Sequence, residues 1–394
     1  MNFYATKIND NGNIAVDDSI LVKGYEATYG SKILTGFKPL FSAEAVERLE
    51  NAGYVVSGKT HTGEFGLDLL GEFSHFADKE DTLKGASAAL VAEGSVKAAL
   101  SVDVNGAPRR AAAQAGIDIL KPTYGTVSRY GIISTAASGE QLSVAAADVK
   151  TVAEIIGVVA GHDEKDGTSL REEKYNYCTD VDVNGKKVAI VKELLEMADD
   201  DTKKAVKDFA DKAAANGVVV EEISFDVFNI ANVAWQILMS AETCNNVSRY
   251  DGVKYGHRSE IYRNIDELYV NSRTEGFNFL TKAVILYGSD ALSKQRYADC
   301  YDKSLRIRRV VSERFEELMK TYDAVLTPVC STMSYDRYAI EDAFEKVFKE
   351  SIFTAVPNLI GAPALVSGGV QLIGKNFAEC TLLSIAGAVE KEGK

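Results

Sequence analysis

The stretch SVDVNGAPRRAAAQAGIDILKPTYGTVSRYGII, residues 101–133, is the most informative part of this sequence. Its small residues crowd beside Asp103 and two arginines, and this density of Gly and Ala lets backbone segments approach one another closely. Turns that carry a nucleophile need such an approach, and their backbone N–H groups can face a developing oxyanion. Yet the residue after Gly106 is Ala107, not Ser, Cys or Thr. The stretch therefore predicts a nucleophile-bearing turn without its nucleophile.

On both sides of this stretch, helical and strand patterns alternate along the chain. Apolar residues recur at helical spacing in some segments, and short β-branched runs are typical of buried strands. We expect helices at 42–53, 143–161, 200–217, 300–320 and from 378, strands at 54–58, 186–194, 218–225 and 323–329, and a hairpin at 363–374. Ser42 is expected to cap the first helix and Gly53 to end it.

This alternation predicts an α/β fold with a large, mixed, mostly parallel twisted sheet that is covered by helices on both faces. No linker or internal repeat divides the sequence, so we expect a single domain over residues 1–394.

Composition narrows the class of protein further. The chain is 46% hydrophobic and 26% charged, an ordinary globular balance. No run approaches the roughly 18–20 apolar residues of a membrane helix, and the polar start lacks the apolar core of a secretory signal, so we expect a cytoplasmic protein. Five cysteines and four histidines are dispersed, without CxxC or HExxH, so we expect no metal and no cofactor.

The net charge of −13 argues against direct binding of nucleic acid, because an acidic surface repels phosphate backbones. A local basic patch of Arg306, Arg308 and Arg309 is the one exception, but it lies in an amphipathic helical pattern. We therefore expect these arginines to be solvated or ion-paired.

Several motifs resemble those of the amidase-signature family, and their order and spacing agree with it. Those shared with the whole family are KPTYGTVSRYGI, GKTHTGEF, GHDEKDGTS and QLIGK. SRYDGVKYG and SRTEGF resemble in particular the A subunits of bacterial glutamyl-tRNA(Gln)/aspartyl-tRNA(Asn) amidotransferases. The resemblance runs from about residue 16 to the C-terminus. It implies the amidase-signature fold without most of the family's N-terminal helical segment.

Members of that family cleave amides with a Ser–Ser–Lys triad, in which a lysine acts through a bridging serine on the nucleophilic serine. The resemblance places the nucleophile at Ala107, the bridging serine at Leu83 and the lysine at Asp17. The arginine and the aspartate that hold glutamine fall on Val284 and Ser351. All three triad groups are thus absent.

The resemblance therefore implies a catalytically inactive relative. Loss of a nucleophile and its base removes most of the rate, because a triad acts as a unit. The surviving motif residues are explained by a role in holding the frame; they are Asp103, Arg109, Lys121, Pro122 and Tyr124. We expect a binding or scaffolding partner of an amidotransferase-like companion subunit or of a second copy of the chain.

Two alternatives stay open. One is an amidase or glutamine amidotransferase subunit with a rebuilt site, for which Ser87, Ser101, Asp17 and Lys84 are the candidate groups. Asp17 and Lys84 would then face one another across the old pocket. The other alternative is a small-molecule sensor that uses the remnant pocket.

Overall fold

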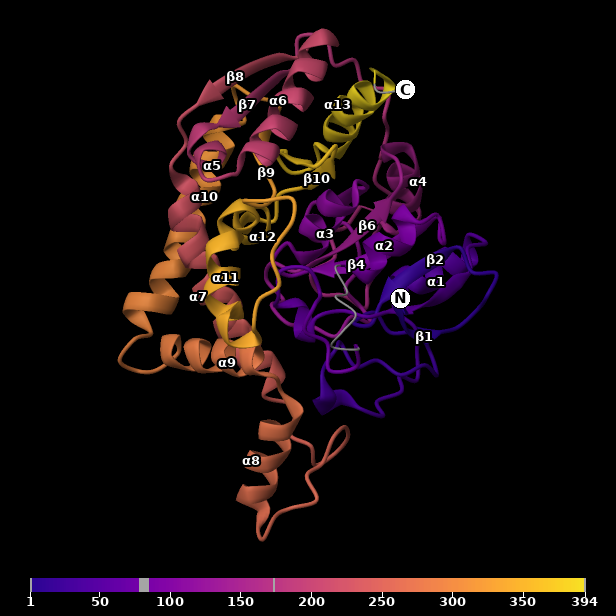
Figure 1. Ribbon diagram of the computed structural model, residues 1–394, viewed down its shortest axis with the longest axis vertical. Coiled ribbons are helices and arrows are strands. Elements are labelled where there is room, and N and C mark those ends of the chain that lie inside the picture. Colours follow the sequence, from indigo (N-terminus) through magenta and orange to yellow (C-terminus); the bar gives the residue numbers. More distant parts are fainter. Residues whose placement is uncertain (1, 78–84, 173, 393–394) are drawn as a thin grey trace.

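The computed structural model describes residues 2–77, 85–172 and 174–392 (Figure 1). Eleven strands form one sheet with the order β1-β3-β2-β4-β6-β5-β10-β11-β9-β7-β8. The strands are β1 (Tyr4–Lys7), β2 (Ile14–Asp17), β3 (Val56–Thr60), β4 (Ala98–Asp103), β5 (Asp118–Lys121), β6 (Gln141–Ala146), β7 (Lys187–Val191), β8 (Val219–Ile223), β9 (Ala324–Pro328), β10 (Ala364–Ser367) and β11 (Val370–Ile373).

The α-helices are α1 (Glu44–Asn51), α2 (Ala86–Ala92), α3 (Ala107–Ala115), α4 (Val149–Val159), α5 (Lys192–Glu196), α6 (Asp200–Ala215), α7 (Val227–Val247), α8 (Ile265–Gly276), α9 (Phe279–Ala291), α10 (Lys303–Leu318), α11 (Ala343–Glu350), α12 (Ala355–Ile360) and α13 (Glu379–Glu392). Figure 1 shows α8 and its loop extending away from the body of the molecule.

The sheet is mixed, as predicted, but the prediction that it is mostly parallel is wrong. In the described part of the chain, parallel pairing joins β2 to β3 and β4, and β7 to β8 and β9. The remaining neighbours pair antiparallel. The reason is that β6 runs against both β4 and β5, and that the predicted hairpin β10–β11 is inserted antiparallel between β5 and β9. Strand direction depends on these long-range pairings, which a local pattern does not show.

Most of the expected elements form where the sequence predicts them, with two corrections. The expected helix at 143–161 is a strand first and a helix second, because Ser143 to Ala146 pair between β4 and β5. Helix α4 begins only after Asp148, whose side chain accepts a hydrogen bond from the N–H of Thr151 at 2.8 Å.

The second correction concerns Ser42, which does not cap α1. The N-cap is Ala43, without a side-chain capping bond, and Ser42 Oγ instead accepts a hydrogen bond from the N–H of Lys23 at 3.0 Å. The hydroxyl is thus used to hold another segment. Gly53 does follow the end of the helix, with a φ of 89° that favours glycine.

The core lies around the central strands. Every residue of β4, β5 and β6 is buried, so both faces of the sheet are covered. Helix α4 packs on β5 and β6, with α1 and α13 beside it, while α2 and α3 pack on β4 and β5. Helices on both faces, as predicted from the near-continuous apolar strands, complete the α/β fold.

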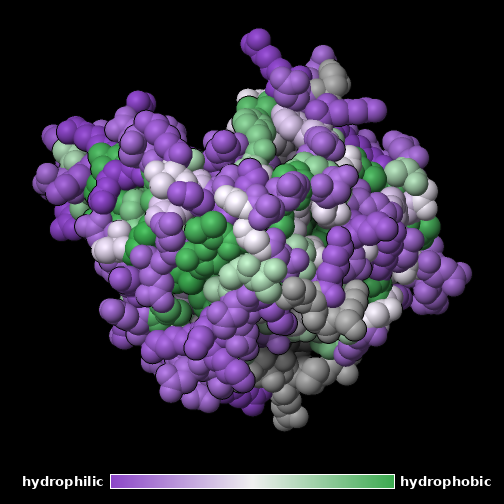
Figure 2. Space-filling view, turned by 90° about the horizontal axis from the view of Figure 1, so that it is seen from above, coloured by the Kyte–Doolittle hydropathy of each residue, from purple (hydrophilic) through white to green (hydrophobic). Residues whose placement is uncertain are grey.

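The surface of the protein is largely polar. Figure 2 shows mostly hydrophilic residues on the face seen from above, with hydrophobic residues gathered in small areas between them. Arg306 and Arg309 form ion pairs with acidic residues one helical turn away, and Arg308 donates to the carbonyl of Ser138. Within the described ranges, no helix is long and apolar enough to cross a membrane.

The buried side chain of Arg109 links the segment around residues 103–109 to the segment 354–371 near the C-terminus. Its Nε donates to Asp103 Oδ2 at 2.7 Å, and both side chains are fully buried. The same guanidinium donates to Gln371 Oε1 at 2.5 Å on β11 and to the carbonyl of Thr354 at 3.2 Å. It also donates to Asn358 Oδ1 on α12. Burial is the largest influence on the pKa of Asp103 and raises it, but the charge and hydrogen bonds of Arg109, with the charge of Lys121 and the hydrogen bond from Asn358, together lower that pKa below its usual value.

Removing the carboxylate should therefore destabilise the protein strongly. We expect Asp103→Ala to lower the free energy of unfolding by about 3–5 kcal/mol, because it leaves a buried guanidinium without its counter-ion. Urea unfolding at pH 7 measures this change. As a matched control, Glu313→Ala breaks the exposed ion pair to Arg309 and should leave the midpoint unchanged. Equal, small shifts for both variants would contradict the role given to Asp103.

Candidate functional site

A small cavity lies where the sequence analysis places the site. It has a volume of about 50 Å³, and Asp17 and Ala107 both border it. His61, Ser87 and Ser101 are among the other residues around it. We call this space the central cavity. Its walls come from the carboxyl end of β2, the first turns of α2 and α3, and strand β4.

The structure thus brings together two of the three predicted positions. Asp17 ends β2 and Ala107 begins α3, 90 positions later in the sequence, yet both face the same space. Leu83 and Lys84, the predicted bridging position and the proposed partner of Asp17, lie outside the described residues. The parallel pairing of β2 with β4 explains the meeting, because it brings the carboxyl ends of both strands to one edge.

The turn before Ala107 keeps the shape that its glycine predicts. Gly106 has a φ of 84°, and a Cβ there would stand 2.4 Å from Cβ of Thr354, so only glycine fits. Its N–H donates to Asp103 Oδ1 at 3.0 Å. Ala107 follows as the first residue of α3 and is 7% exposed. The tip of this turn therefore presents a methyl group to the central cavity.

Asp17 is held by hydrogen bonds to its carboxylate. Oδ2 accepts from the N–H of Val102 at 2.7 Å, and Oδ1 accepts from the N–H of Ser19 at 2.9 Å and from the Ser19 hydroxyl. Burial raises the pKa of Asp17 to about 6, although these hydrogen bonds oppose the shift. An acceptor-only group that binds the backbone of β4 thus occupies the position predicted for a lysine.

A buried lysine does lie nearby, on the adjacent strand. Lys59 of β3 is fully buried, and its Nζ lies 3.0 Å from Asp18 Oδ1 and donates to the carbonyl of Glu26 at 2.8 Å. Burial lowers the pKa of Lys59, and the carboxylate of Asp18 opposes this shift. The ammonium is engaged by Asp18, so it holds the loop after β2. The sequence analysis did not single out Lys59, although it stands within the GKTHTGEF motif.

Polar atoms without a protein partner also border the central cavity. His61 Nδ1 and Thr62 Oγ1 are buried and have no hydrogen-bond partner within the described residues. Ser87 is different, because its hydroxyl lies 2.7 Å from Thr60 Oγ1. The volume suits a few waters, each of which needs roughly 10–15 Å³. It is far below the ~300 Å³ at which pockets for drug-sized ligands begin.

The positions predicted to have lost their glutamine contacts lie away from this cavity. Val284 is buried in α9. Ser351 begins a short 3-10 helix, donates to the carbonyl of Val347 at 2.6 Å and accepts from Asn105 Nδ2 at 2.7 Å. Ser351 therefore supports the turn at Gly106 through its hydrogen bond with Asn105.

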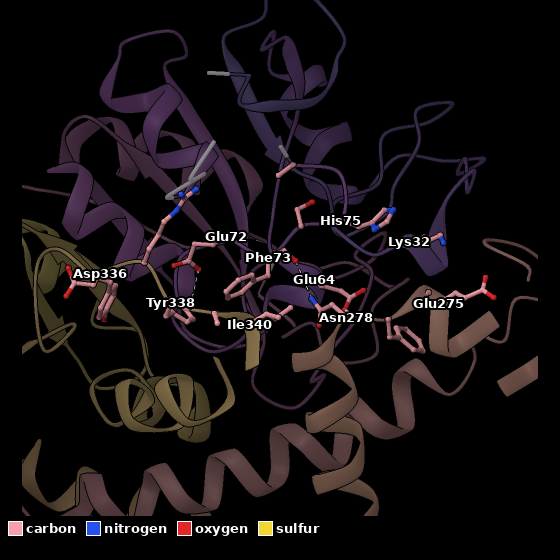
Figure 3. Close-up of a pocket in the computed structure, with 17 residues that line it drawn as sticks. Lys32, Glu64, Glu72, Phe73, His75, Glu275, Asn278, Asp336, Tyr338 and Ile340 are labelled. Carbon is pink, nitrogen blue, oxygen red and sulfur yellow. Dashed lines mark hydrogen bonds between the residues drawn. The ribbon is translucent and has the colours of Figure 1, made fainter. Parts of the chain in front are cut away.

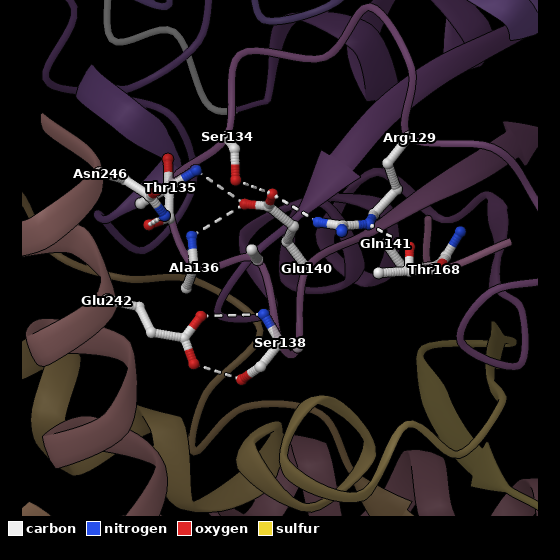
Figure 4. Close-up of polar contacts among 12 residues, drawn as sticks. Arg129, Ser134, Thr135, Ala136, Ser138, Glu140, Gln141, Thr168, Glu242 and Asn246 are labelled. Carbon is white, nitrogen blue, oxygen red and sulfur yellow. Dashed lines mark hydrogen bonds and ion pairs between the residues drawn. The ribbon is translucent and has the colours of Figure 1, made fainter. Parts of the chain in front are cut away.

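The motif residues between 128 and 141 have a structural role (Figure 4). The carboxylate of Glu140 accepts from the N–H groups of Thr135 and Ala136 at 2.8 and 2.9 Å, and from Arg129 at 3.1 Å. Glu242 of α7 accepts from the N–H of Ser138 at 2.9 Å. These contacts fix the loop before β6, and none of its residues lines the central cavity.

A second, larger cavity was not predicted from the sequence. It has a volume of about 740 Å³ and lies between residues 64–77, 275–278 and 335–340 (Figure 3). Glu64, Glu72 and Tyr338 are among its lining residues, and Tyr338 donates to Glu72 at 3.4 Å. Burial raises the pKa of Glu64 to about 7, and burial together with Asp68 raises that of Glu72. These segments meet only in the folded chain, and their signals in the sequence are Glu64 of the GKTHTGEF motif and the end of the SRTEGF motif, residues 275–277.

Comparison with known proteins places these features in a family. The sequence profile of the amidase family matches residues 13–383. The A subunit of the glutamyl-tRNA(Gln) amidotransferase of Lacticaseibacillus paracasei is 34% identical over 404 residues, which cover 96% of this chain and 83% of that protein. The protein of the same name from Lachnospira eligens is 35% identical over 399 residues, with 96% and 83% covered.

The fold agrees with this assignment. The crystal structure of the A subunit of the Thermotoga maritima glutamyl-tRNA(Gln) amidotransferase superimposes with a TM-score of 0.80 at 27% identity, covering 99% of this chain and 87% of that one. A further amidase structure, at 21% identity and a TM-score of 0.76, shares the fold. With the profile, the relatives and the fold in agreement, this chain belongs to the amidase family.

Proposed function

We propose that this chain is a catalytically inactive member of the amidase family that acts as a binding or scaffolding partner. The single observation that carries the proposal is Ala107 at the tip of a turn whose supporting contacts are intact. A methyl group cannot attack an amide carbonyl or form an acyl intermediate. The proposal thus explains a preserved frame around a missing nucleophile.

The other groups around the central cavity support this interpretation. Asp17 stands at the position proposed for the family's lysine, and its carboxylate accepts hydrogen bonds from the N–H groups of Val102 and Ser19. The proposed base is thus replaced by a buried carboxylate, which carries the opposite charge. Ser87 contacts Thr60, a hydroxyl that cannot serve as a strong base at neutral pH. The described residues thus offer Ser87 no hydrogen-bonded base.

The size of the central cavity points the same way. A volume of about 50 Å³ accommodates a few waters but not the amide and carbon chain of an amino-acid side chain together with the attacking groups. A central cavity too small for a substrate is expected when the outer surface, and not this cavity, is the functional part.

We infer the scaffolding role from the relatives. Their name describes one component of an amidotransferase, a protein that assembles with other subunits. The similarity to such proteins extends over 96% of this chain, which supports a frame on which a companion subunit or a second copy could dock. The role needs no catalysis by this chain.

The first prediction from this proposal concerns turnover. Purified chain should release no ammonia from glutamine and should hydrolyse no simple amide above the buffer rate, because the triad is absent. The triple variant Ala107→Ser, Leu83→Ser, Asp17→Lys should gain measurable amidase activity if the frame is still aligned. Ala107→Ser alone, which lacks the base, is the matched control and should stay inactive.

Turnover by the natural chain would contradict the proposal and favour a rebuilt site. In that case Asp17→Ala and Lys84→Ala identify the groups in use, because loss of either should reduce the rate by at least about 100-fold if they supply acid–base catalysis. Turnover that neither substitution changes would exclude this pair.

The second prediction concerns assembly. In native lysate the chain should elute well above its own mass of 42.7 kDa, and the purified chain should either self-associate or recover this larger size when its companion is added back. Size-exclusion chromatography with light scattering measures the mass. A chain that is monomeric and alone in lysate under low-salt conditions contradicts the scaffolding role.

A small-molecule sensor is the second candidate, and the larger cavity is the observation that favours it. Its volume of about 740 Å³, with Phe73, Tyr338 and protonatable Glu64 and Glu72 on the walls, falls in the range of ligand pockets. The central cavity, with a volume of about 50 Å³, is too small to serve this role by itself.

The third prediction separates the sensor from a pure scaffold. A ligand that binds only the folded protein raises its melting temperature by mass action. We expect a thermal-shift screen of amides, amino acids and nucleotides at about 1 mM to give no shift for a scaffold. A sensor should give a shift that Glu72→Gln or Tyr338→Phe abolishes, while Glu317→Gln at an exposed position of α10 leaves it unchanged.

A further inference from the structure

Two cysteines far apart in the sequence lie side by side in the fold. Cys178 belongs to the irregular segment between α4 and β7, and Cys380 lies in the first turn of α13. They are 202 positions apart, yet the backbone N–H of Cys178 donates to Sγ of Cys380 at 3.0 Å. The two side chains also contact one another. Both residues are partly exposed, so a small reagent can reach them.

The backbone around the pair is already docked. Cys380 Sγ donates to the carbonyl of Asn176 at 3.3 Å, and the N–H of Val181 donates to Ser384 Oγ at 3.0 Å. The rings of Tyr175 and Phe377 stack with their centroids 6.1 Å apart. These contacts hold residues 175–181 along the first turns of α13, so the sulfurs can meet without a large movement of either segment.

We propose that Cys178 and Cys380 form a redox-sensitive dithiol, which a peroxide converts into a disulfide between the 160–186 segment and α13. The Cys380 sulfur lies 3.0 Å from the backbone N of Cys178 and the two side chains contact one another, and a disulfide needs two cysteines that are close neighbours in this way. Cys178 lies in the connection between α4 and β7, which carries the chain from strands β1–β6 to β7. Helix α13, which contains Cys380, packs on both α4 and α6. The link would thus tie this connection covalently to α13.

The reaction balances with hydrogen peroxide as the oxidant. The thiolate of Cys380 attacks one peroxide oxygen, the O–O bond breaks, and a sulfenic acid and water result. The sulfur of Cys178 then attacks Sγ of Cys380, the S–S bond forms, the S–O bond breaks, and the leaving hydroxide takes up a proton as water. Two thiols lose two electrons in total, and one peroxide is reduced to two waters.

The surroundings make this reaction slow at neutral pH. Burial, the contact with Cys380 and the charge of Asp180 together raise the pKa of Cys178 to about 12, so little of its thiol is ionised at pH 7. Attack by Cys178 on the sulfenic acid should therefore become faster as the pH rises from 7 to 9. Because the thiol of Cys178 reacts slowly, we expect the disulfide to form only when peroxide persists.

The experiment uses the full chain and counts its thiols. Treatment of the reduced protein with hydrogen peroxide at pH 8 should lower the number of free thiols from five to three without adding oxygen to the mass. Peptide mapping should recover one cross-linked pair that contains Cys178 and Cys380. The melting temperature should rise by about 5 °C, because the link closes a long loop in the unfolded chain, and dithiothreitol should reverse the change.

Two single variants and one control make the result specific. Cys178→Ser and Cys380→Ser should each abolish the loss of two thiols and the rise in melting temperature. Cys244→Ser, which removes a partly buried thiol in α7, should start from four thiols and still lose two. Oxidation to sulfinic acid without a cross-link, a link between different molecules, or a cross-link that survives in both variants would overturn the proposal.

Discussion

The buried guanidinium of Arg109 is the contact on which the rest of the fold depends. Arg109 lies in the first turn of α3, directly after the turn at Gly106. Its guanidinium donates to Asp103, which precedes that turn, and to Gln371 and Asn358 near the C-terminus. A buried guanidinium is costly unless it is paired and hydrogen-bonded. The contacts of Arg109 therefore fix the turn at Gly106 relative to β11 and α12. The sheet order brings the same parts of the chain together, because β10 pairs with β5 and β11 pairs with β10.

The contacts that hold this turn do not depend on a nucleophile. The residues that hold the turn, such as Gly106 and Asp103, contribute to folding whether or not a nucleophile follows them. Ala107 is simply the next residue, and a methyl group there leaves α3 and its contacts unchanged. Asp17 shows the same separation, since its carboxylate is satisfied by backbone N–H groups of β4 and the adjacent loop. Selection on stability alone can therefore maintain these motif residues, whichever residue follows Gly106.

The two cavities have different physical characters. The central cavity is small and bordered by buried polar atoms of His61 and Thr62 that lack partners among the described residues, which suits water. The larger cavity is lined by aromatic rings and by carboxyl groups whose pKa values burial raises toward neutrality. A pocket with protonated carboxyls can donate as well as accept hydrogen bonds.

Local patterns in the sequence determined the elements, because amphipathic spacing and β-branched runs act within a few residues: α6, α10, β7 and the hairpin β10–β11 were all predictable. The motif resemblance determined the family, and it placed Ala107 and Asp17 at one site. Tertiary structure alone decided the antiparallel course of β6, the use of Ser42 by Lys23, the position of Lys59 beside Asp18, and the larger cavity. Each of these depends on contacts between residues distant in sequence, whose geometry is set by burial and hydrogen bonding in the folded chain rather than by local preference.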